Sequence, residues 1–319
     1  MPCELEEQDV GIFPGRTLFT KRATPCMKPT AIYLPPKRAG SDNSVDVVIW
    51  LHGFYVPDHV LLFRGDPARI REQVRDSGKD VAVIAPWLGH EYSVGGKFVG
   101  NYNVKDLASP KWGERYLNQI LAAISDPPLE IGNLFLACHS GGGNAMRNLV
   151  GTLGKYELNL TACWGFDCLY GANATPDDAN FWYQWCSESQ DRALEIMYGP
   201  STLPQSVKLD LLARGLATPD GDEVEVQLGA LTNLRVTIGH TDVFGAFGQM
   251  VRVPDLDPDF VKKFMTPTRP NPTGRMPKPR LRGEYLQQAI ANVRKTIAFP
   301  DDIHYMIARG GFFSQLSKL

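Results

Sequence analysis

The 319-residue chain is predicted to fold as an α/β protein, with a mostly parallel central sheet and helices on both faces. Two patterns support this. Short β-branched runs such as 45–51 and 133–138 have the near-continuous hydrophobicity of strands buried on both faces. Stretches with helical spacing lie between these runs, and such alternation is typical of βαβ units. An apolar fraction of 43% and a net charge of −2 are those of an ordinary globular protein.

The expected elements cover most of the chain. Strands are expected at 30–34, 45–51, 80–85, 133–138, 160–166, 194–198 and 234–238. Helical spacing of apolar residues predicts helices at 66–77, 110–125, 178–190, 203–216, 284–295 and 307–319, and one that begins at 142. Residues 1–45 are otherwise turn-rich. We treat the whole chain, 1–319, as a single domain.

Composition excludes several classes of protein. The apolar fraction is too high for a disordered chain, and 33 basic against 35 acidic residues argue against a nucleic-acid-binding surface. No apolar run approaches the roughly 18 residues of a membrane span. The acidic N-terminus lacks the basic and apolar regions of a secretory signal. The sequence therefore predicts a soluble, cytoplasmic protein with neither nucleic acid nor membrane as a partner.

The cysteines and glycines give no sign of a cofactor or metal. The six cysteines include no Cys-x-x-Cys pair and no histidine at zinc-like spacing. Buried thiols in a reducing compartment are the favoured interpretation, and a bridge between Cys3 and Cys26 stays open as an alternative. The glycine-dense turn 141–143 lacks the spacing of phosphate-binding loops. We expect no cofactor and no metal.

A proline-rich, basic stretch interrupts the alternation late in the chain. Six prolines fall between 258 and 279, and the interval 262–282 holds seven basic residues and no acidic one. Proline removes backbone donors, so regular structure is not expected there. We interpret 251–300 as an insertion within the domain. It is a candidate lid, a candidate binding site for an anionic group, or a solvated loop.

The segment Cys138-His139-Ser140-Gly141-Gly142 lies between an expected strand and an expected helix. A serine at such a tight turn projects its hydroxyl beyond the sheet, and small neighbours permit close chain packing. The helix N-terminus that follows favours a developing oxyanion. The segment resembles the nucleophile elbow, G-x-S-x-G, of the α/β hydrolases, with Ser140 as nucleophile and Cys138 in place of the first glycine. The alternative is a glycine-rich turn with a capping serine.

An earlier segment extends the resemblance. The expected strand 45–51 ends in His52-Gly53-Phe54. In the hydrolases that the chain resembles, the residue after such a His-Gly pair contributes a backbone N–H to the oxyanion hole. The resemblance therefore implies an oxyanion hole made by the N–H groups of Phe54 and Gly141, with Gly53 shaping the loop.

A serine nucleophile needs a base, and two histidines follow Ser140 in the sequence, His240 and His304. His304 precedes the terminal stretch 307–319, and a catalytic histidine on a loop before the last helix is the arrangement of the hydrolases that the chain resembles. His240 directly follows the strand 234–238, which is also a plausible place. We favour His304 as the base and keep His240 as the alternative.

The acid that orients the base has two candidates. Asp167 ends the expected strand 160–166, next to the nucleophile strand, where catalytic groups of parallel sheets gather. Asp242 follows the strand 234–238 and competes with it. The strand in which most of the related hydrolases carry the acid, 194–198, is followed by no carboxylate. We favour Asp167, whose alternative role is that of a turn cap.

Together these residues imply a cofactor-independent serine hydrolase that cleaves small-molecule carboxylic esters through an acyl-enzyme. Amidase, peptidase, lipase and thioesterase activities stay open, because a fold does not fix the substrate. A non-catalytic binding protein on the same scaffold, which contacts an acidic partner through 262–282, is the alternative from another class. The aromatic residues around Asp167 are expected to line a pocket or, for at least half of them, to pack in the core. These are Trp164, Tyr170, Trp182, Tyr183 and Trp185.

Overall fold

The computed structural model divides into two compact units, residues 1–168 with 308–319 and residues 169–307. The organisation of the chain as a single domain stays a prediction. The described residues are 3–8, 15–21, 26–36, 44–64, 68–95, 97–170, 178–213, 224–225, 233–238, 280–281 and 303–319.

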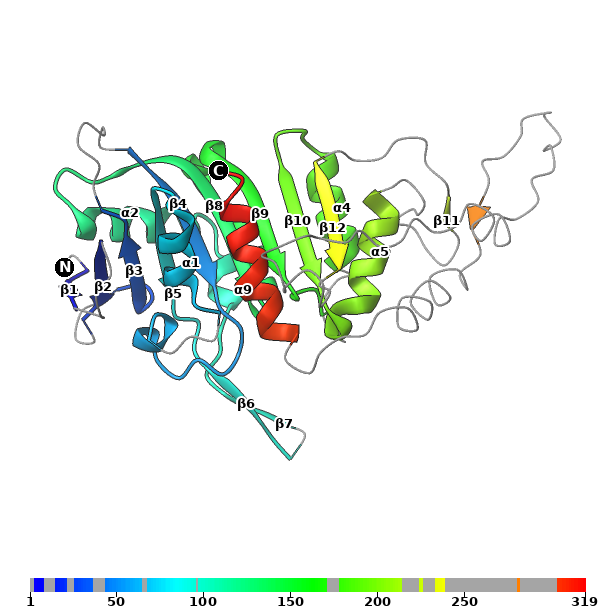
Figure 1. Cartoon of the computed structure of the whole chain (residues 1–319), viewed down its shortest axis with the longest axis horizontal. Helices are drawn as coiled ribbons and strands as arrows, with labels where there is room; N and C mark the ends of the chain where they lie inside the picture. The colour runs from blue at the N-terminus through cyan, green and yellow to red at the C-terminus, as the bar shows by residue number, and fades with distance from the viewer. Residues whose placement is uncertain are drawn as a thin grey trace. The chain divides into compact units, whose positions relative to one another are not determined.

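The first unit is built on a twisted mixed sheet (Figure 1). Its strands lie in the order β1 (Leu5–Glu7), β2 (Arg16–Thr20), β3 (Thr30–Leu34), β5 (Val81–Pro86), β4 (Ser44–Leu51), β8 (Glu130–His139) and β9 (Leu160–Phe166). The pairs from β1 to β5 are antiparallel, whereas β5, β4, β8 and β9 run parallel to one another. The expected strands of this unit are therefore confirmed, and the sheet extends further at its N-terminal edge.

The strand order creates a switch point between β4 and β8. The chain leaves β4 toward β5 on one side and then crosses back to β8 on the other side. In parallel sheets, catalytic and ligand-binding groups gather at such a switch point, beyond the carboxyl ends of the strands. His52 follows β4 and Ser140 follows β8. The topology therefore brings both sequence motifs to one place.

Helices cover both faces of this sheet. Those of the first unit are α1 (Ile70–Ser77), α2 (Trp112–Ile124), α3 (Gly142–Val150) and the part of α9 (Ile303–Leu316) that begins at Ala308, with the short 3-10 helices η1 (His59–Leu62), η2 (Lys105–Ala108) and η3 (Gly154–Asn159). In Figure 1, α1 and α9 lie in front of the sheet and α2 lies behind it. The Phe313 N–H of α9 donates to the Gln73 side chain of α1 at 2.7 Å, which joins the two front helices.

Aromatic side chains fill the core between the sheet and α9. Trp50 stacks on Phe166 with ring centroids 6.1 Å apart, and Phe312 of α9 packs against both rings. Trp164 stacks on Phe135 at 4.7 Å. Trp164, Trp182 and Trp185 are all buried, whereas Tyr170 is exposed. The expectation that at least half of the aromatic residues near Asp167 pack in the core is confirmed by these three tryptophans.

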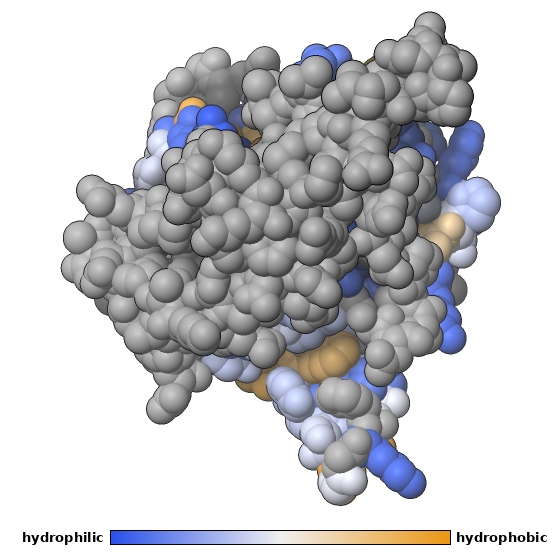
Figure 2. Space-filling view, turned by 90° about the vertical axis from the view of Figure 1, so that its right-hand side faces the viewer, coloured by the Kyte–Doolittle hydropathy of each residue, from blue (hydrophilic) through white to orange (hydrophobic). Residues whose placement is uncertain are grey.

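A two-stranded hairpin stands apart from the main sheet. It consists of β6 (Glu91–Val94) and β7 (Lys97–Gly100), paired antiparallel. The hairpin projects at the bottom of Figure 1 and forms the lowest part of the space-filling view in Figure 2, where it carries apolar and hydrophilic residues. The sequence analysis did not predict it, because four-residue strands give too short a pattern to recognise.

The N-terminal segment contains more structure than expected. Strands β1 and β2 lie in the segment that was expected to be turn-rich, and Cys3 is bonded to Cys26. The bridge corrects the favoured interpretation of these two cysteines as thiols. Disulfides are typical of oxidising compartments, so the cytoplasmic location stays a prediction that the bond does not support.

The other four cysteines, Cys138, Cys163, Cys168 and Cys186, are buried thiols as expected. Burial raises the pKa of Cys186 to about 12, so this thiol is protonated and unreactive at neutral pH. The described ranges contain no group of three or more His, Cys, Asp or Glu side chains that could hold a metal. None of their helices is long and apolar enough to cross a membrane.

The second unit contains a parallel pair of strands with helices beside it. Its elements are α4 (Asp178–Ser187), β10 (Ala193–Tyr198), η4 (Pro200–Thr202), α5 (Leu203–Ala213), β12 (Leu234–Ile238), and the short antiparallel pair β11 (Val224–Glu225) and β13 (Arg280–Leu281). These positions confirm the expected strands and helices between 178 and 238. Apart from β13, the proline-rich stretch 251–300 and the helix expected at 284–295 lie outside the described residues.

Candidate active site

Ser140 occupies a left-handed turn between β8 and α3. Its φ is +56°, a conformation that costs a non-glycine residue about 1 kcal/mol or more and that persists at functional sites. Its N–H donates to the Phe166 carbonyl at 3.1 Å, and its carbonyl accepts from the Gly143 N–H at 3.1 Å. The serine is thus anchored to β9 on one side and to the helix on the other. A strand, a strained serine and a helix in succession are the parts of a nucleophile elbow.

The glycines after Ser140 are required by close backbone approach. A Cβ on Gly142 would lie 2.1 Å from the Leu51 carbonyl oxygen, and one on Gly143 would lie 2.2 Å from the Cys168 carbonyl oxygen. Neither backbone oxygen can move aside without shifting its strand end. The two glycines therefore let α3 begin directly against the end of β4 and against the segment that follows β9. Cys138, the departure from the glycine pattern, is fully buried inside β8 and does not disturb the turn.

Gly53 brings the β4 loop against the nucleophile. A Cβ on Gly53 would lie 2.6 Å from the Ser140 Cβ and 3.0 Å from its Oγ. Any side chain at position 53 would therefore occupy the space next to the hydroxyl. The structure brings the predicted residues Ser140 and Gly53 together. A Cβ on Gly141 would meet the Phe54 ring at 2.7 Å, so these two residues are neighbours as well.

His52 fixes the orientation of this loop. The Leu88 N–H donates to its Nε2 at 2.8 Å, so Nδ1 carries the proton and donates to the Gly53 carbonyl at 2.5 Å. Burial lowers the pKa of His52 to about 4, and this favours the neutral ring. In a trans peptide the carbonyl and the next N–H point in opposite directions. Because His52 holds the Gly53 carbonyl, it also sets the direction of the Phe54 N–H.

Tyr102 supports the same loop from the side. Its hydroxyl donates to the His52 carbonyl at 2.9 Å, and its ring packs edge-on against Phe54 with centroids 4.8 Å apart. The sequence analysis missed Tyr102 and Leu88 as supporting residues. No motif surrounds either residue, since they reach the loop from the segment after β5 through tertiary contacts alone.

Asp167 lies directly beside the nucleophile strand. It follows Phe166, the residue whose carbonyl accepts the Ser140 N–H, and it is completely buried. Its φ of +44° places a second non-glycine residue in the left-handed region next to the turn. A buried carboxylate needs a partner or a proton. The position agrees with an acid in the site, and the role of Asp167 as that acid stays a prediction.

The predicted bases are placed less completely. His304 lies in the first turn of α9, half-buried, with its ring 5.5 Å from that of Tyr305. It is therefore inside the helix and not on a loop before it, because the helix begins four residues earlier than the apolar spacing indicated. His304 belongs to the second unit, so its role as base stays a prediction. The alternatives His240 and Asp242 lie outside the described residues.

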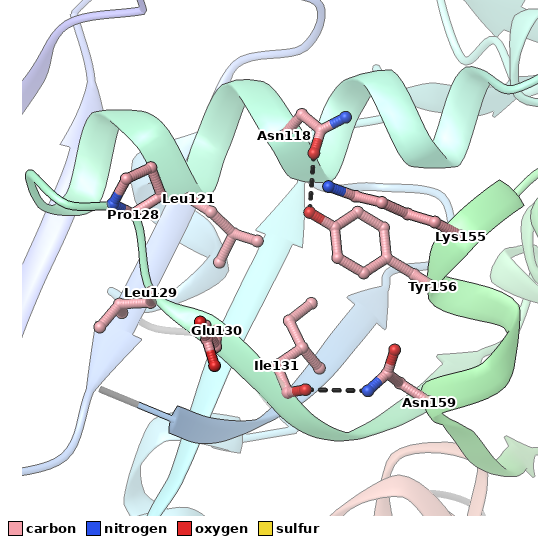
Figure 3. Close-up of a pocket in the computed structure, with 9 residues that line it drawn as sticks. All are labelled: Asn118, Leu121, Pro128, Leu129, Glu130, Ile131, Lys155, Tyr156 and Asn159. Carbon is pink, nitrogen blue, oxygen red and sulfur yellow. Dashed lines mark hydrogen bonds between the residues drawn. The ribbon is translucent and has the colours of Figure 1, made fainter. Parts of the chain in front are cut away.

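A separate hollow lies at the opposite end of β8. It has a volume of about 420 Å³ and is shown in Figure 3. The Tyr156 hydroxyl donates to the Asn118 side-chain oxygen at 2.8 Å across it, and the Asn159 amide donates to the carbonyls of Ile131 and Gly132 at 2.9 Å. The Lys155 ammonium lies 4.8 Å from the centre of the Tyr156 ring. No residue predicted for catalysis lines this hollow.

The strand order of the first unit and the Ser140 turn define a fold of the α/β-hydrolase type. No family model matches the chain, and no curated protein matches it. Solved structures that resemble it in part include an S-formylglutathione hydrolase from Agrobacterium tumefaciens, with 14% identity, 75% of this chain and 90% of that chain covered, and a TM-score of 0.43. A ferulic acid esterase has 13% identity, covers 67% of this chain and 87% of its own, and has a TM-score of 0.41. The carboxylesterase CesB (YbfK) from Bacillus subtilis has 10% identity, coverage of 69% and 59%, and a TM-score of 0.30.

Proposed function

We propose that the protein is a serine hydrolase that cleaves small-molecule carboxylic esters. The observation that carries the proposal is the strained turn of Ser140 between β8 and α3, with a glycine at position 53 that leaves the space beside the hydroxyl unfilled. A turn that keeps a serine at φ +56° and clears the space beside its Oγ has the geometry of a nucleophile. No cofactor or metal is needed for this chemistry.

In the proposed reaction the Ser140 hydroxyl attacks the ester carbonyl while His304 takes its proton, with Asp167 orienting the imidazole. The N–H groups of Phe54 and Gly141 stabilise the oxyanion. Gly141 is the residue before the first turn of α3, where the helix itself leaves N–H groups unused. Collapse of the intermediate returns the proton from His304 to the departing alcohol. Water then cleaves the acyl-enzyme by the same steps in reverse order.

Labelling with a fluorophosphonate, followed by mass spectrometry, tests the nucleophile. We expect one label, at Ser140, and we expect Ser140→Ala to lose both the label and at least about 10³-fold of the ester turnover. Ser125→Ala is the matched control, because the Ser125 hydroxyl lies at the other end of β8 and donates only to the Pro127 carbonyl. Labelling of Ser140→Ala protein at an unchanged rate contradicts the proposal.

A second comparison separates the candidate bases and acids. His304→Ala is expected to abolish turnover of a generic ester, whereas His240→Ala is expected to retain most of it. Asp167→Asn and Asp242→Asn form the parallel pair, with the larger loss expected at Asp167. Collapse of turnover only in His240→Ala or only in Asp242→Asn reverses the corresponding assignment. Steady-state kcat/KM values for all four variants decide both questions.

A further inference from the structure

A row of aromatic side chains leads outward from the Ser140 turn. Phe54 lies against Gly141, next to the nucleophile. The Phe54 and Tyr55 ring centroids are 6.4 Å apart, and those of Tyr55 and Tyr92 are 6.0 Å apart. Both distances are within the range of interacting aromatic pairs. The row therefore passes from the candidate oxyanion loop to the β6–β7 hairpin without a break.

The outer part of the row is exposed to solvent. The exposed fraction is 48% for Tyr55 and 39% for Tyr92. Antiparallel pairing sets Tyr92 opposite Val99 and Val94 opposite Lys97, so Lys97 lies at the tip of the hairpin face that Tyr92 shares with Val94 and Val99. Their exposed fractions are 64% and 58%. Apolar side chains gathered on one exposed face beside a site are typical of a binding surface.

The backbone at Tyr55 has a strained conformation. Tyr55 has a φ of +68°, a conformation that favours glycine and that a bulky residue adopts only under constraint. Burial does not explain the choice of tyrosine there, since half of the side chain stays in water. The strain has the effect of pointing a large aromatic ring out of the loop that follows His52.

Backbone hydrogen bonds attach the hairpin to the segment that holds the loop of residues 52–54. At its base the His90 carbonyl accepts from the N–H groups of Asn101 and Tyr102 at 2.8 and 3.0 Å, and the Leu88 carbonyl accepts from the Asn103 N–H at 2.7 Å. Leu88 in turn donates to His52. Two glycines allow this close approach: a Cβ on Gly89 or Gly100 would lie 2.4 or 2.1 Å from a backbone oxygen of the facing chain. These hydrogen bonds tie the hairpin to the loop that lies against the Ser140 turn.

We infer that Tyr55 and Tyr92 form a wall that binds an aryl group of the ester substrate, with Val94 and Val99 extending it. The inference rests on the proposed function and names its substrate class. An aryl group gains edge-to-face or offset stacking beyond its buried area and loses little rotamer entropy. A flexible alkyl chain gains only the buried area and loses rotamer freedom when it is ordered. The row of rings therefore favours aryl-bearing esters over alkyl esters of equal size.

Hydrolysis of matched esters, followed in a pH-stat, tests the wall. Ethyl 4-phenylbutanoate and ethyl decanoate have acyl groups of equal carbon number, and ethyl acetate serves as the reference. The esters 4-phenylbutyl acetate and decyl acetate make the same comparison on the alcohol side. For either ethyl 4-phenylbutanoate or 4-phenylbutyl acetate, we expect kcat/KM relative to that for ethyl acetate to fall about three- to tenfold. The fall is expected in Tyr55→Ala and in Tyr92→Ala separately, mainly through a higher KM.

Three control variants separate binding from structure. Tyr55→Phe and Tyr92→Phe keep the rings and are expected to keep the ratio. Leu158→Ala removes an exposed apolar side chain from η3, far along the chain from the hairpin, and is also expected to keep it. An equal fall for the decanoate or decyl ester overturns the aryl preference. A ratio that stays unchanged in both tyrosine-to-alanine variants overturns the wall altogether.

A binding measurement distinguishes failure of the wall from failure of the proposed function. Ligand-observed NMR with 4-phenylbutanamide and decanamide, which carry no ester, reports binding without turnover. We expect the Ser140→Ala protein to bind 4-phenylbutanamide more strongly than decanamide. When Tyr55→Ala or Tyr92→Ala is added to Ser140→Ala, we expect the two amides to bind equally. An enzyme that cleaves esters but shows no such preference keeps the proposed function and loses the wall. A protein that binds the aryl amide through Tyr55 and Tyr92 but cleaves no ester keeps the wall and loses the proposed function.

Discussion

The two ends of β8 differ in backbone conformation and in the hydrogen bonding of their polar groups. At the carboxyl end, Ser140 and Asp167 have positive φ, and glycines allow chain segments to touch. At the amino end, the hollow of Figure 3 is lined by polar groups that satisfy one another, such as Tyr156 with Asn118. The backbone strain lies at the carboxyl end, whereas the hollow of about 420 Å³ lies at the amino end. The volume of a hollow therefore does not by itself mark a reactive site. The energy stored in unusual conformations distinguishes the two ends.

The largest expected effect comes from filling the contact beneath the Ser140 turn. Gly142→Ala places a Cβ 2.1 Å from the Leu51 carbonyl oxygen, and we expect it to destabilise the fold by about 3 kcal/mol or more. Gly151→Ala, at the other end of α3, meets nothing within 4 Å and serves as the matched control. Urea unfolding of both variants measures the difference. Equal stability of the two variants would remove the distinction between the two ends of β8.

A somewhat smaller effect is expected from pH, through His52. Its folded-state pKa of about 4 lies below the usual 6.5, so below pH 6.5 the unfolded chain binds the additional proton. Stability is therefore complete above about pH 6.5 and falls as pH decreases toward 4, by up to about 3 kcal/mol. Urea unfolding between pH 4 and 7 measures this slope.

His52→Gln removes the titrating ring and provides the control for that slope. The variant is expected to flatten the pH dependence and also to lower kcat more than it raises KM, because the Phe54 N–H loses its fixed direction. His59, which is buried outside the candidate site, offers the matched substitution His59→Gln. A slope that persists unchanged in His52→Gln assigns the titration to another group.

The smallest expected effect belongs to the amino end of β8. Tyr156→Phe deletes the hydroxyl that donates to Asn118 and is expected to cost about 1 kcal/mol of stability. None of the described residues that line the hollow has a positive φ, so kcat/KM for any ester should stay within twofold of the wild-type value. A loss of ester turnover comparable to that of His52→Gln would show that this hollow takes part in catalysis.

Much of the fold could be predicted because its strands carry local signals. The runs 30–34, 160–166 and 234–238 form strands with the expected bounds, because β-branched and apolar residues predominate in each run. Strands β1 and β2 escaped prediction because they are short. The edge strand β1 and its neighbour β2, which also pairs with β3, are stabilised by pairing and by the Cys3–Cys26 bond more than by their own composition.

The candidate site likewise contains residues with a local sequence signal and residues without one. Ser140 and Gly53 could be found because tight turns demand particular residues at fixed positions in the chain. The roles of Leu88 and Tyr102 could not be found, since each depends on a contact across the fold that leaves no local pattern. His304 was expected on a loop because apolar spacing marks the buried side of a helix and not its first turn.

The bond between Cys3 and Cys26 has a consequence for the sheet edge. The loop that it closes contains β1 and β2, and β1 is a strand of three residues whose two glutamates are exposed. Such a short, acidic border discourages other molecules from adding strands to the sheet. Behind it, Leu18 and Phe19 of β2 are buried. Reduction of the bond removes the covalent tie of this edge, and pairing with β2 and the ion pairs Glu4–Lys21 and Glu7–Arg16 then hold the border strand in place.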